Sequence, residues 1–222
     1  MLPENYAERV YAAVLGKCIG VRLGAPVEAE NWTYERIRAV YGERIHGYLR
    51  PYRVFGADDD INGPAYFFQV LEEKDDPQLL DFAHAWVDFV RDGKGFFWWG
   101  GYGISTEHTA YLNLRSGIPA PRSGSIAQNG STIAEQIGGQ IFIDTWGLVA
   151  PGNPALAAKL AGKAASVTHD GNALYGGIFV AVCISAAFEE KEIKKILETG
   201  LSYIPSDCEY AKIVRTVMEF YE

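Results

Sequence analysis

Cysteine is scarce in this chain of 222 residues: Cys18, Cys183 and Cys208 lie far apart and show no Cys-x-x-Cys spacing. An odd number of isolated cysteines argues against a disulfide framework or a zinc site and fits a reducing compartment. Each cysteine is most simply a small core residue. We therefore expect a cytoplasmic protein.

Basic runs are also lacking, and the chain has 28 acidic against 20 basic residues, for a net charge of −8. A chain of that sign does not attract a phosphate backbone, so we expect no nucleic acid as a partner bound by bulk electrostatics. An anionic small ligand held by a metal ion and backbone donors remains compatible with this charge.

Signals for membrane targeting are absent as well. Residues 1–5 have no basic region ahead of an apolar run, so no signal peptide is predicted. The longest apolar stretch, residues 176–188, is too short to cross a bilayer. We expect no membrane partner, and nothing in the sequence indicates an oligomeric state.

Helical periodicity is what the sequence does contain. Apolar residues recur at helical spacing from Tyr6 onward, and Gly24 followed by Pro26 is expected to end that helix. Residues 173–188 are apolar on all sides, which predicts a helix at the centre of the fold. Few segments alternate with period two, so the sequence predicts an all-α protein, and its length predicts one domain over residues 1–222.

The middle of the chain is rich in turn residues. Residues 116–130 read as one long loop, and long loops in compact domains are often functional. Ser131 or Thr132 is expected to cap the next helix. The buried stripe of that helix is predicted to be Ile133, Ile137, Ile141 and Phe142.

Three consecutive carboxylates, Asp58, Asp59 and Asp60, stand just before an aromatic-rich helical segment. One interpretation is that they are solvated and that one of them caps the helix, where a negative charge meets free backbone N–H groups. The other is that they bind a hard divalent cation through oxygen. Taken alone, the triplet favours the cap, because short acidic motifs often occur by chance.

Five motifs in order change that balance, because together they resemble the ADP-ribosylglycohydrolase family, of the dinitrogenase-reductase-activating glycohydrolase type. The resemblance implies an all-α orthogonal multi-helix bundle and a site with two Mg²⁺ or Mn²⁺ ions. It also implies a substrate that is an ADP-ribosylated protein or an ADP-ribose-type small molecule. The motifs are Gly16-x3-Gly20-x3-Gly24-Ala25-Pro26-Val27-Glu28, Asp58-Asp59-Asp60 and the segments 134–141, 146–154 and 167–171.

The resemblance also assigns roles to the acidic residues. The family's Thr-Asp-Asp metal motif falls on Asp58-Asp59-Asp60, with Asp59 and Asp60 as ligands. In the other register Ala57 takes the place of the threonine and Asp58 and Asp59 are the ligands, so Asp59 is common to both. Glu28 matches the family's acidic residue after the glycine-rich helix, where it would act as base or orient water. The predicted catalytic residues are therefore Glu28 and Asp59.

Substrate-binding residues carry over to two further segments. The loop that cradles the ribose and phosphates matches Asn129, Gly130 and Ser131, and the pair that faces the nucleotide matches His169 and Asp170. Simpler structural roles stand beside these: Asn129-Gly130 is also a turn sequence, and His169 could only cap the helix that follows it.

One departure from the family pattern bears on activity. The family's second metal motif, Asp-x-Asp-Thr late in the chain, has no counterpart after the triplet. Either the chain lacks the C-terminal part of the fold, or its cation site is incomplete. We expect a divalent-metal-dependent hydrolase of the ADP-ribosyl glycosidic bond, and whether this chain is active alone stays open. The alternatives are a non-catalytic nucleotide-binding or structural member of the same fold, and a glycosidase acting on a related ribosyl substrate.

Overall fold

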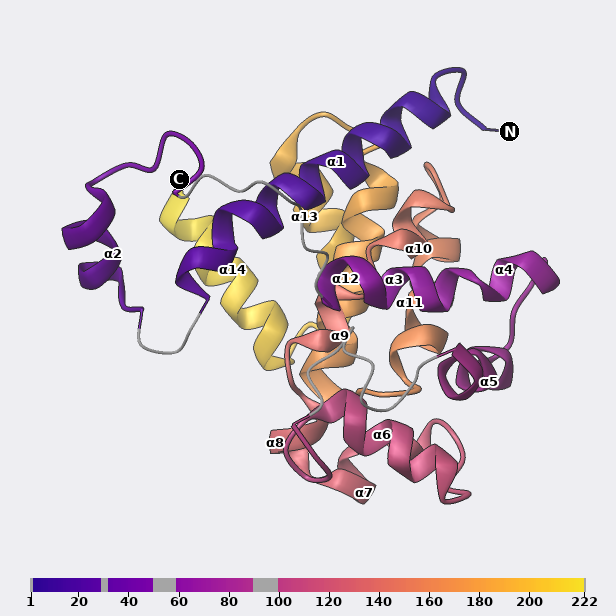
Figure 1. The fold of residues 1–222 in the computed structure, drawn as a ribbon. Helices are drawn as coiled ribbons and strands as arrows, with labels where there is room; N and C mark the ends of the chain where they lie inside the picture. Colours follow the sequence, from indigo (N-terminus) through magenta and orange to yellow (C-terminus); the bar gives the residue numbers. More distant parts are fainter. Residues whose placement is uncertain (1, 29–31, 50–58, 90–99, 222) are drawn as a thin grey trace. The chain divides into compact units, whose positions relative to one another are not determined.

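A computed structural model describes residues 2–28, 32–49, 59–89 and 100–221 (Figure 1). Every regular element in these ranges is a helix, which confirms the all-α prediction. The chain divides into two units, residues 1–57 and 58–222, which are described separately. The prediction of one domain stays a prediction.

The described residues of the first unit form two α-helices and one turn of 3-10 helix: α1 Tyr6–Gly24, η1 Ala25–Val27 and α2 Tyr34–Tyr41. As predicted, α1 ends at Gly24, and Pro26 lies in the short helix that follows. Thr33 caps α2, because its hydroxyl accepts a hydrogen bond from the backbone N–H of Arg36 at 3.3 Å. The Arg36 guanidinium lies 4.5 Å from the centre of the Trp32 ring, a cation–π distance.

The segment Tyr6–Val27 has an unexpected property. Its 22 residues are long and apolar enough to cross a membrane, with a mean hydropathy of 1.4 in its most apolar 18-residue window. The expectation that residues 176–188 were the longest apolar stretch is therefore wrong, because Tyr6–Val27 is longer and meets the criterion despite its scattered charges. A buried core helix or a signal sequence meets the same criterion, so the cytoplasmic location stays a prediction.

The second unit is built around α12, Gly171–Ala186, which packs against α8 to α11, α13 and α14 (Figure 1). This confirms the central position predicted from its apolar sequence. Glycine permits the closest crossing, because a Cβ on Gly177 would overlap the carbonyl oxygen of Gly139. The other elements are α3 Asp59–Phe68, α4 Val70–Glu73, α5 Leu79–Phe89, α6 Thr106–Arg115, η2 Arg122–Gly124, α7 Ile126–Asn129, α8 Ser131–Ala134, α9 Gly138–Ile141, α10 Thr145–Leu148, α11 Pro154–Ala165, α13 Ile193–Leu201 and α14 Glu209–Tyr221.

Aromatic side chains join α3 and α5 to α10, which packs on α12. Phe67 stacks on Trp86 with ring centres 5.1 Å apart, and Phe82 meets Trp146 edge-on at 5.2 Å. All four rings are at most 1% exposed. Such pairs contribute roughly 0.5–1.5 kcal/mol beyond their burial. They fix the position of α3, whose first residues are the predicted metal ligands.

The predicted helix that begins at Ser131 is wrong in detail. The segment forms two short helices, α8 and α9, and Ile137 between them is 62% exposed rather than part of a buried stripe. The glycine at 130 precedes α8, and no side-chain cap is formed. The predicted loop 116–130 contains two single helical turns, η2 and α7.

Candidate functional site

The His169–Asp170 turn and the loop after η2 meet in the second unit. Asp170 is the N-cap of α12, and its carboxylate accepts hydrogen bonds from the N–H of Gly171 at 2.7 Å and of Ile126 at 2.9 Å. Its own N–H donates to the carbonyl of Ala134 at 3.0 Å. A single carboxylate thus joins the beginnings of α7 and α12, although Asp170 and Ile126 are 44 residues apart in sequence.

Asn129 is held from the other side by α6. The amide nitrogen of Asn113 donates to the side-chain oxygen of Asn129 at 2.9 Å, and the amide nitrogen of Asn129 donates to the carbonyl of Ser123 at 2.8 Å. Both halves of the Asn129 amide therefore have protein partners. Gly130 has φ +79°, a conformation that favours glycine and turns the chain between α7 and α8. Ser131 is exposed and begins α8.

His169 is almost completely buried, with 1% of its surface exposed. Its Nδ1 lies 2.7 Å from the hydroxyl of Thr168, and its Nε2 lies 3.5 Å from a carboxylate oxygen of Glu107. Glu107 is itself only 6% exposed. The helix that follows is capped by Asp170 and not by His169. The ring is thus part of an internal contact between α6 and the turn before α12.

Sequence reasoning did not single out Glu107. A glutamate in the first turn of a helix is common, because it favours the positive end of the helix dipole, so it gives no signal of a special role. Only the fold shows that this one points inward to a histidine.

The two predicted metal ligands that the structure describes stand at the start of α3. Asp59 and Asp60 are half-buried, and the N–H of Asp60 donates to a carboxylate oxygen of Asp59 at 3.1 Å. Asp59 precedes Gly63 and Phe67 by one and two helical turns, and both of these residues are buried. The face of α3 that carries Asp59 is therefore the face that packs on the core.

The structure does not place the other two predicted acidic residues, Asp58 and Glu28, beside Asp59 and Asp60. Asp58 lies outside the described residues, and Glu28 belongs to the first unit, where it follows η1. Among the residues described, no group of three or more His, Cys, Asp or Glu side chains is placed to hold a metal ion. The oxygen donors of Asp59 and Asp60 fit Mg²⁺ or Mn²⁺ in chemistry but form only part of a ligand set.

A pocket of about 290 Å³ adjoins the Asp170 turn. Its walls come from the α8–α9 segment and from the starts of α12 and α14. Glu135 shapes it by accepting hydrogen bonds from the N–H and the side-chain amide of Asn172 at 2.6 and 2.8 Å. Burial raises the pKa of Tyr210, so its phenol stays a neutral donor. The lining residues are Glu135, Gln136, Ile137, Gln140, Asn172, Ala173 and Tyr210.

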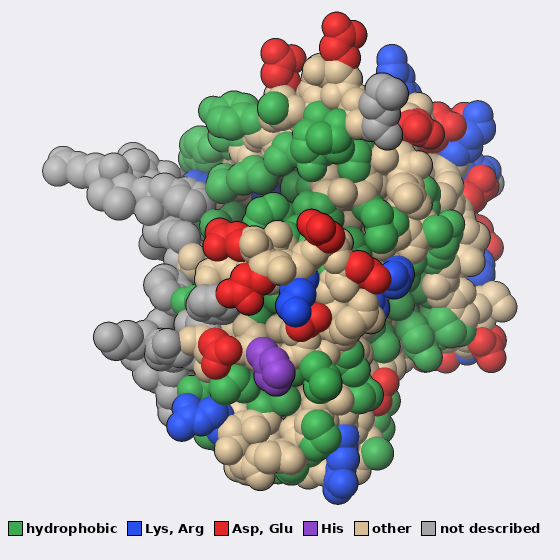
Figure 2. Space-filling model, turned by 90° about the vertical axis from the view of Figure 1, so that its right-hand side faces the viewer, with side chains coloured by type: hydrophobic (Ala, Val, Ile, Leu, Met, Phe, Trp, Pro, Cys, Tyr) green, Lys and Arg blue, Asp and Glu red, His purple; other side chains and the backbone are tan. Residues whose placement is uncertain are grey.

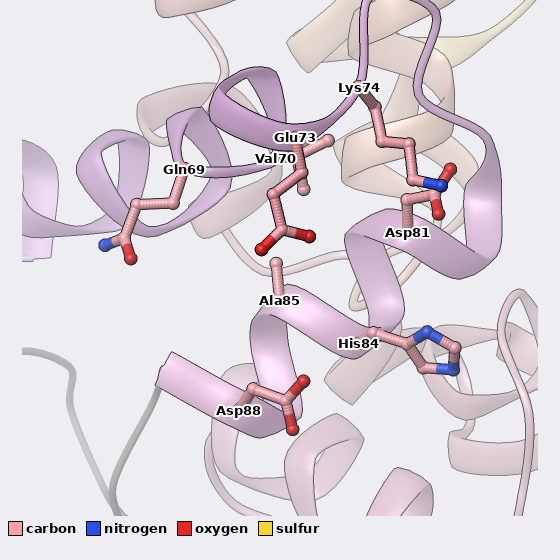
Figure 3. A pocket seen from close by; sticks show the side chains of 8 residues that line it. All are labelled: Gln69, Val70, Glu73, Lys74, Asp81, His84, Ala85 and Asp88. Atoms are coloured by element: carbon pink, nitrogen blue, oxygen red, sulfur yellow. The ribbon is translucent and has the colours of Figure 1, made fainter.

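A second pocket of about 300 Å³ lies between α4 and α5 and contains none of the predicted site residues (Figure 3). Glu73 points from α4 toward Ala85, and Asp88 lies one turn further along α5 (Figure 3). These carboxylates make the pocket acidic. No geometry there indicates a ligand.

Acidic and basic side chains lie side by side on the surface (Figure 2). Lys159 binds Asp76 at 2.9 Å and holds the pKa of that carboxyl below its usual range, chiefly through this hydrogen bond. Both side chains are at least half exposed, and such pairs contribute little to stability. Asp76 is therefore a suitable control residue for changes at buried carboxylates.

Comparison with protein families identifies the family of this chain. The model of a family described as ADP-ribosylglycohydrolase matches residues 2–222, essentially the whole chain. No curated protein matches significantly, and no solved structure does.

Proposed function

Because the chain belongs to the ADP-ribosylglycohydrolase family, we propose that it is a divalent-metal-dependent hydrolase that cleaves the glycosidic bond between an ADP-ribosyl group and its acceptor. The family match supports a glycohydrolase-type activity on ADP-ribosyl groups. The observation that carries the proposal is the extent of that match, over residues 2–222 of an all-helical chain. The identity of the substrate and the dependence on a metal ion are proposed in addition to that activity.

We place the ADP-ribosyl group at the pocket beside the Asp170 turn. The pocket offers the side-chain amide of Gln140 and the phenol of Tyr210, which suit the hydroxyl groups of a sugar. Both ends of the Gln136 amide are already hydrogen-bonded to other residues of the chain. The N–H groups at the start of α12 already have carboxylate partners in Asp170 and Glu135. Hydrogen bonds from side chains, rather than the end of that helix, are therefore expected to orient the ligand.

Asp59 and Asp60 are the residues we propose to hold the cations. Bound there, Mg²⁺ or Mn²⁺ would act as a Lewis acid and lower the pKa of a bound water. Glu28 is proposed to accept a proton from the attacking water or to orient it. The water oxygen forms a bond to the anomeric carbon while the glycosidic bond breaks, and the proton lost by the water passes to the leaving acceptor. The products are free ADP-ribose and the unmodified acceptor.

The test is release of free ADP-ribose from peptides modified on arginine or on serine, measured by chromatography with Mn²⁺, with Mg²⁺ and with a chelator. We expect metal-dependent release that Asp59→Asn abolishes and that Asp76→Asn, an exposed carboxylate paired with Lys159, leaves unchanged. Release that continues undiminished in the chelator and in Asp59→Asn would contradict the metal assignment.

One observation favours a non-catalytic alternative. The sequence has no second Asp-x-Asp after the acidic triplet, so a chain that binds the nucleotide without hydrolysing it fits the same fold. Calorimetry with ADP-ribose separates the two: binding without release supports the alternative, and neither binding nor release contradicts both. Release of ribose from a related nucleoside, but of no ADP-ribose, would indicate the third reading, a glycosidase for a different ribosyl substrate.

A further inference from the structure

Glu107 and His169 form a buried contact that the proposed reaction does not use. Glu107 lies in the first turn of α6, and His169 lies in the turn before α12. The two side chains are 6% and 1% exposed, and 3.5 Å separates Oε1 of Glu107 from Nε2 of His169. Buried carboxylates are expensive unless they are paired, so this arrangement requires an explanation.

The helix that carries Glu107 makes the buried charge tolerable. Ser105 is the N-cap of α6, and its hydroxyl donates to the second carboxylate oxygen of Glu107 at 3.4 Å. A negative charge in the first helical turn is also favoured by the helix dipole. The other carboxylate oxygen, Oε1, faces the imidazole ring of His169.

A missing side chain makes room for the contact. A Cβ on Gly138, at the start of α9, would overlap Oε1 of Glu107 and lie 2.9 Å from Nε2 of His169. The residue at 138 must therefore be glycine for the carboxylate and the ring to approach. Three elements, α6, α9 and the turn before α12, converge at this point.

Thr168 forms a hydrogen bond with Nδ1 of His169 whose donor depends on which ring nitrogen carries the proton. The Thr168 hydroxyl is 2.7 Å from Nδ1 of His169 but 3.5 Å from its other acceptor, the carbonyl of Ala165. If the hydroxyl donates in the short contact, Nδ1 is the acceptor and the ring proton resides on Nε2, toward Glu107. Among the described residues, Nε2 has no hydrogen-bond partner, and Glu107 is the acidic group that faces it.

We propose that Glu107 is a positioning residue that accepts the Nε2 proton of His169 and thereby holds the His169–Asp170 turn against the loop after η2. The link is direct, because Asp170 follows His169 and binds the N–H of Ile126 and the carbonyl of Ala134. The effect of Glu107 on ligand binding rests on the proposed function. The effect of Glu107 on the protonation of the imidazole is independent of that function.

The first experiment is ¹⁵N NMR of the histidine side chains, with the His169 signals assigned from their loss in His169→Asn. We expect a protonated Nε2 and an unprotonated Nδ1 in the wild-type chain and in Glu107→Gln, whose amide oxygen replaces the acceptor and whose amide nitrogen can donate to Ser105. Glu107→Leu removes the acceptor and should abolish this preference. Asp76→Leu is the control, because this exposed carboxylate pairs with Lys159 and contacts neither the ring nor the pocket.

The second experiment is calorimetry with ADP-ribose on the same variants. Loss of a hydrogen bond to a charged group corresponds to about 10–100-fold in an equilibrium constant. We expect a loss of ADP-ribose affinity of up to that size in Glu107→Leu and recovery to about twofold of wild type in Glu107→Gln, since the acceptor is restored.

The outcomes separate this proposal from the proposed function. A wild-type ring that carries its proton on Nδ1, or on both nitrogens at neutral pH, overturns the positioning role whatever the chain binds. If Glu107→Leu does not fold, the spectra of the wild type and of Glu107→Gln still decide, because a Gln variant that loses the Nε2–H form also overturns it. A wild-type chain with the expected spectrum that does not bind ADP-ribose leaves the positioning role intact and contradicts the function.

Discussion

Gly138→Ala tests the packing on which the convergence of α6, α9 and the His169 turn depends. The added methyl group would overlap Oε1 of Glu107 and lie 2.9 Å from both Nε2 of His169 and the Phe142 ring. Overpacking of this kind costs about 1–3 kcal/mol. For a chain of this size, each kcal/mol lowers Tm by about 2–4 °C, so the expected decrease is roughly 2–12 °C.

Gly162→Ala is the matched control for that substitution. Gly162 lies inside α11, and the nearest atom to an added Cβ is a methyl carbon of Ile178 at 3.7 Å, an ordinary contact. Replacing glycine by alanine in a helix interior contributes up to about 1 kcal/mol, so this variant should be as stable as the wild type or more so.

The assay is thermal unfolding of both variants by circular dichroism, with Gly138→Ala repeated in a Glu107→Ala background. Truncation of Glu107 removes the nearest obstacle, so the cost of Gly138→Ala should be smaller there, a non-additive result expected for residues in contact. An alanine at 138 that leaves Tm unchanged while Gly162→Ala behaves as expected would refute the described contact. Equal costs in both backgrounds would refute the role of Glu107 in it.

Three further predictions follow from individual side chains. Asp59→Asn should remove most of the Mn²⁺ affinity measured by calorimetry while Asp76→Asn keeps it, and full binding by the Asp59 variant would show that the ligands lie elsewhere. Asp170→Ala should lower the free energy of unfolding in urea by about 0.5–2 kcal/mol, the range for a lost N-cap, since its carboxylate accepts from Gly171 and from Ile126; no change would contradict those bonds. Burial raises the pKa of the Cys183 thiol to about 12 in the folded chain, whereas the thiol of the unfolded chain titrates near pH 8.5. The contribution of the buried thiol to stability is therefore complete below about pH 8.5 and is lost as the pH rises toward 12. The Tm difference between wild type and Cys183→Ala should therefore shrink above pH 8.5, and a difference that grows would contradict the burial.

The long helices were predictable from the sequence, because their apolar patterns are set by burial along a single element. Residues 173–188 were predicted as a central helix, and α12 occupies Gly171–Ala186. The stretch from Ser131 was not, because tertiary contacts override its apparent periodicity. Glu135 turns away to bind Asn172, and the glycine at 139 packs directly on α12, so one expected helix becomes α8 and α9.

The candidate site was predictable only in part, for a similar reason. The resemblance selected Asn129 and Asp170, which lie at the two ends of α7 in the fold. The hydrogen bond from Ile126 to Asp170 joins residues 44 positions apart and has no local signal in the sequence. Glu107 was missed because its position after Ser105 is ordinary for any helix start. The surroundings of a side chain, rather than its spacing, decide such roles.

The central claim is that Asp59 and Asp60 at the start of α3 hold a divalent cation in an ADP-ribosyl hydrolase. Anomalous scattering from crystals grown with Mn²⁺ tests it most directly. We predict an anomalous peak in contact with the carboxylates of Asp59 and Asp60. Manganese bound only at other side chains, with these two carboxylates free of metal, would contradict the account.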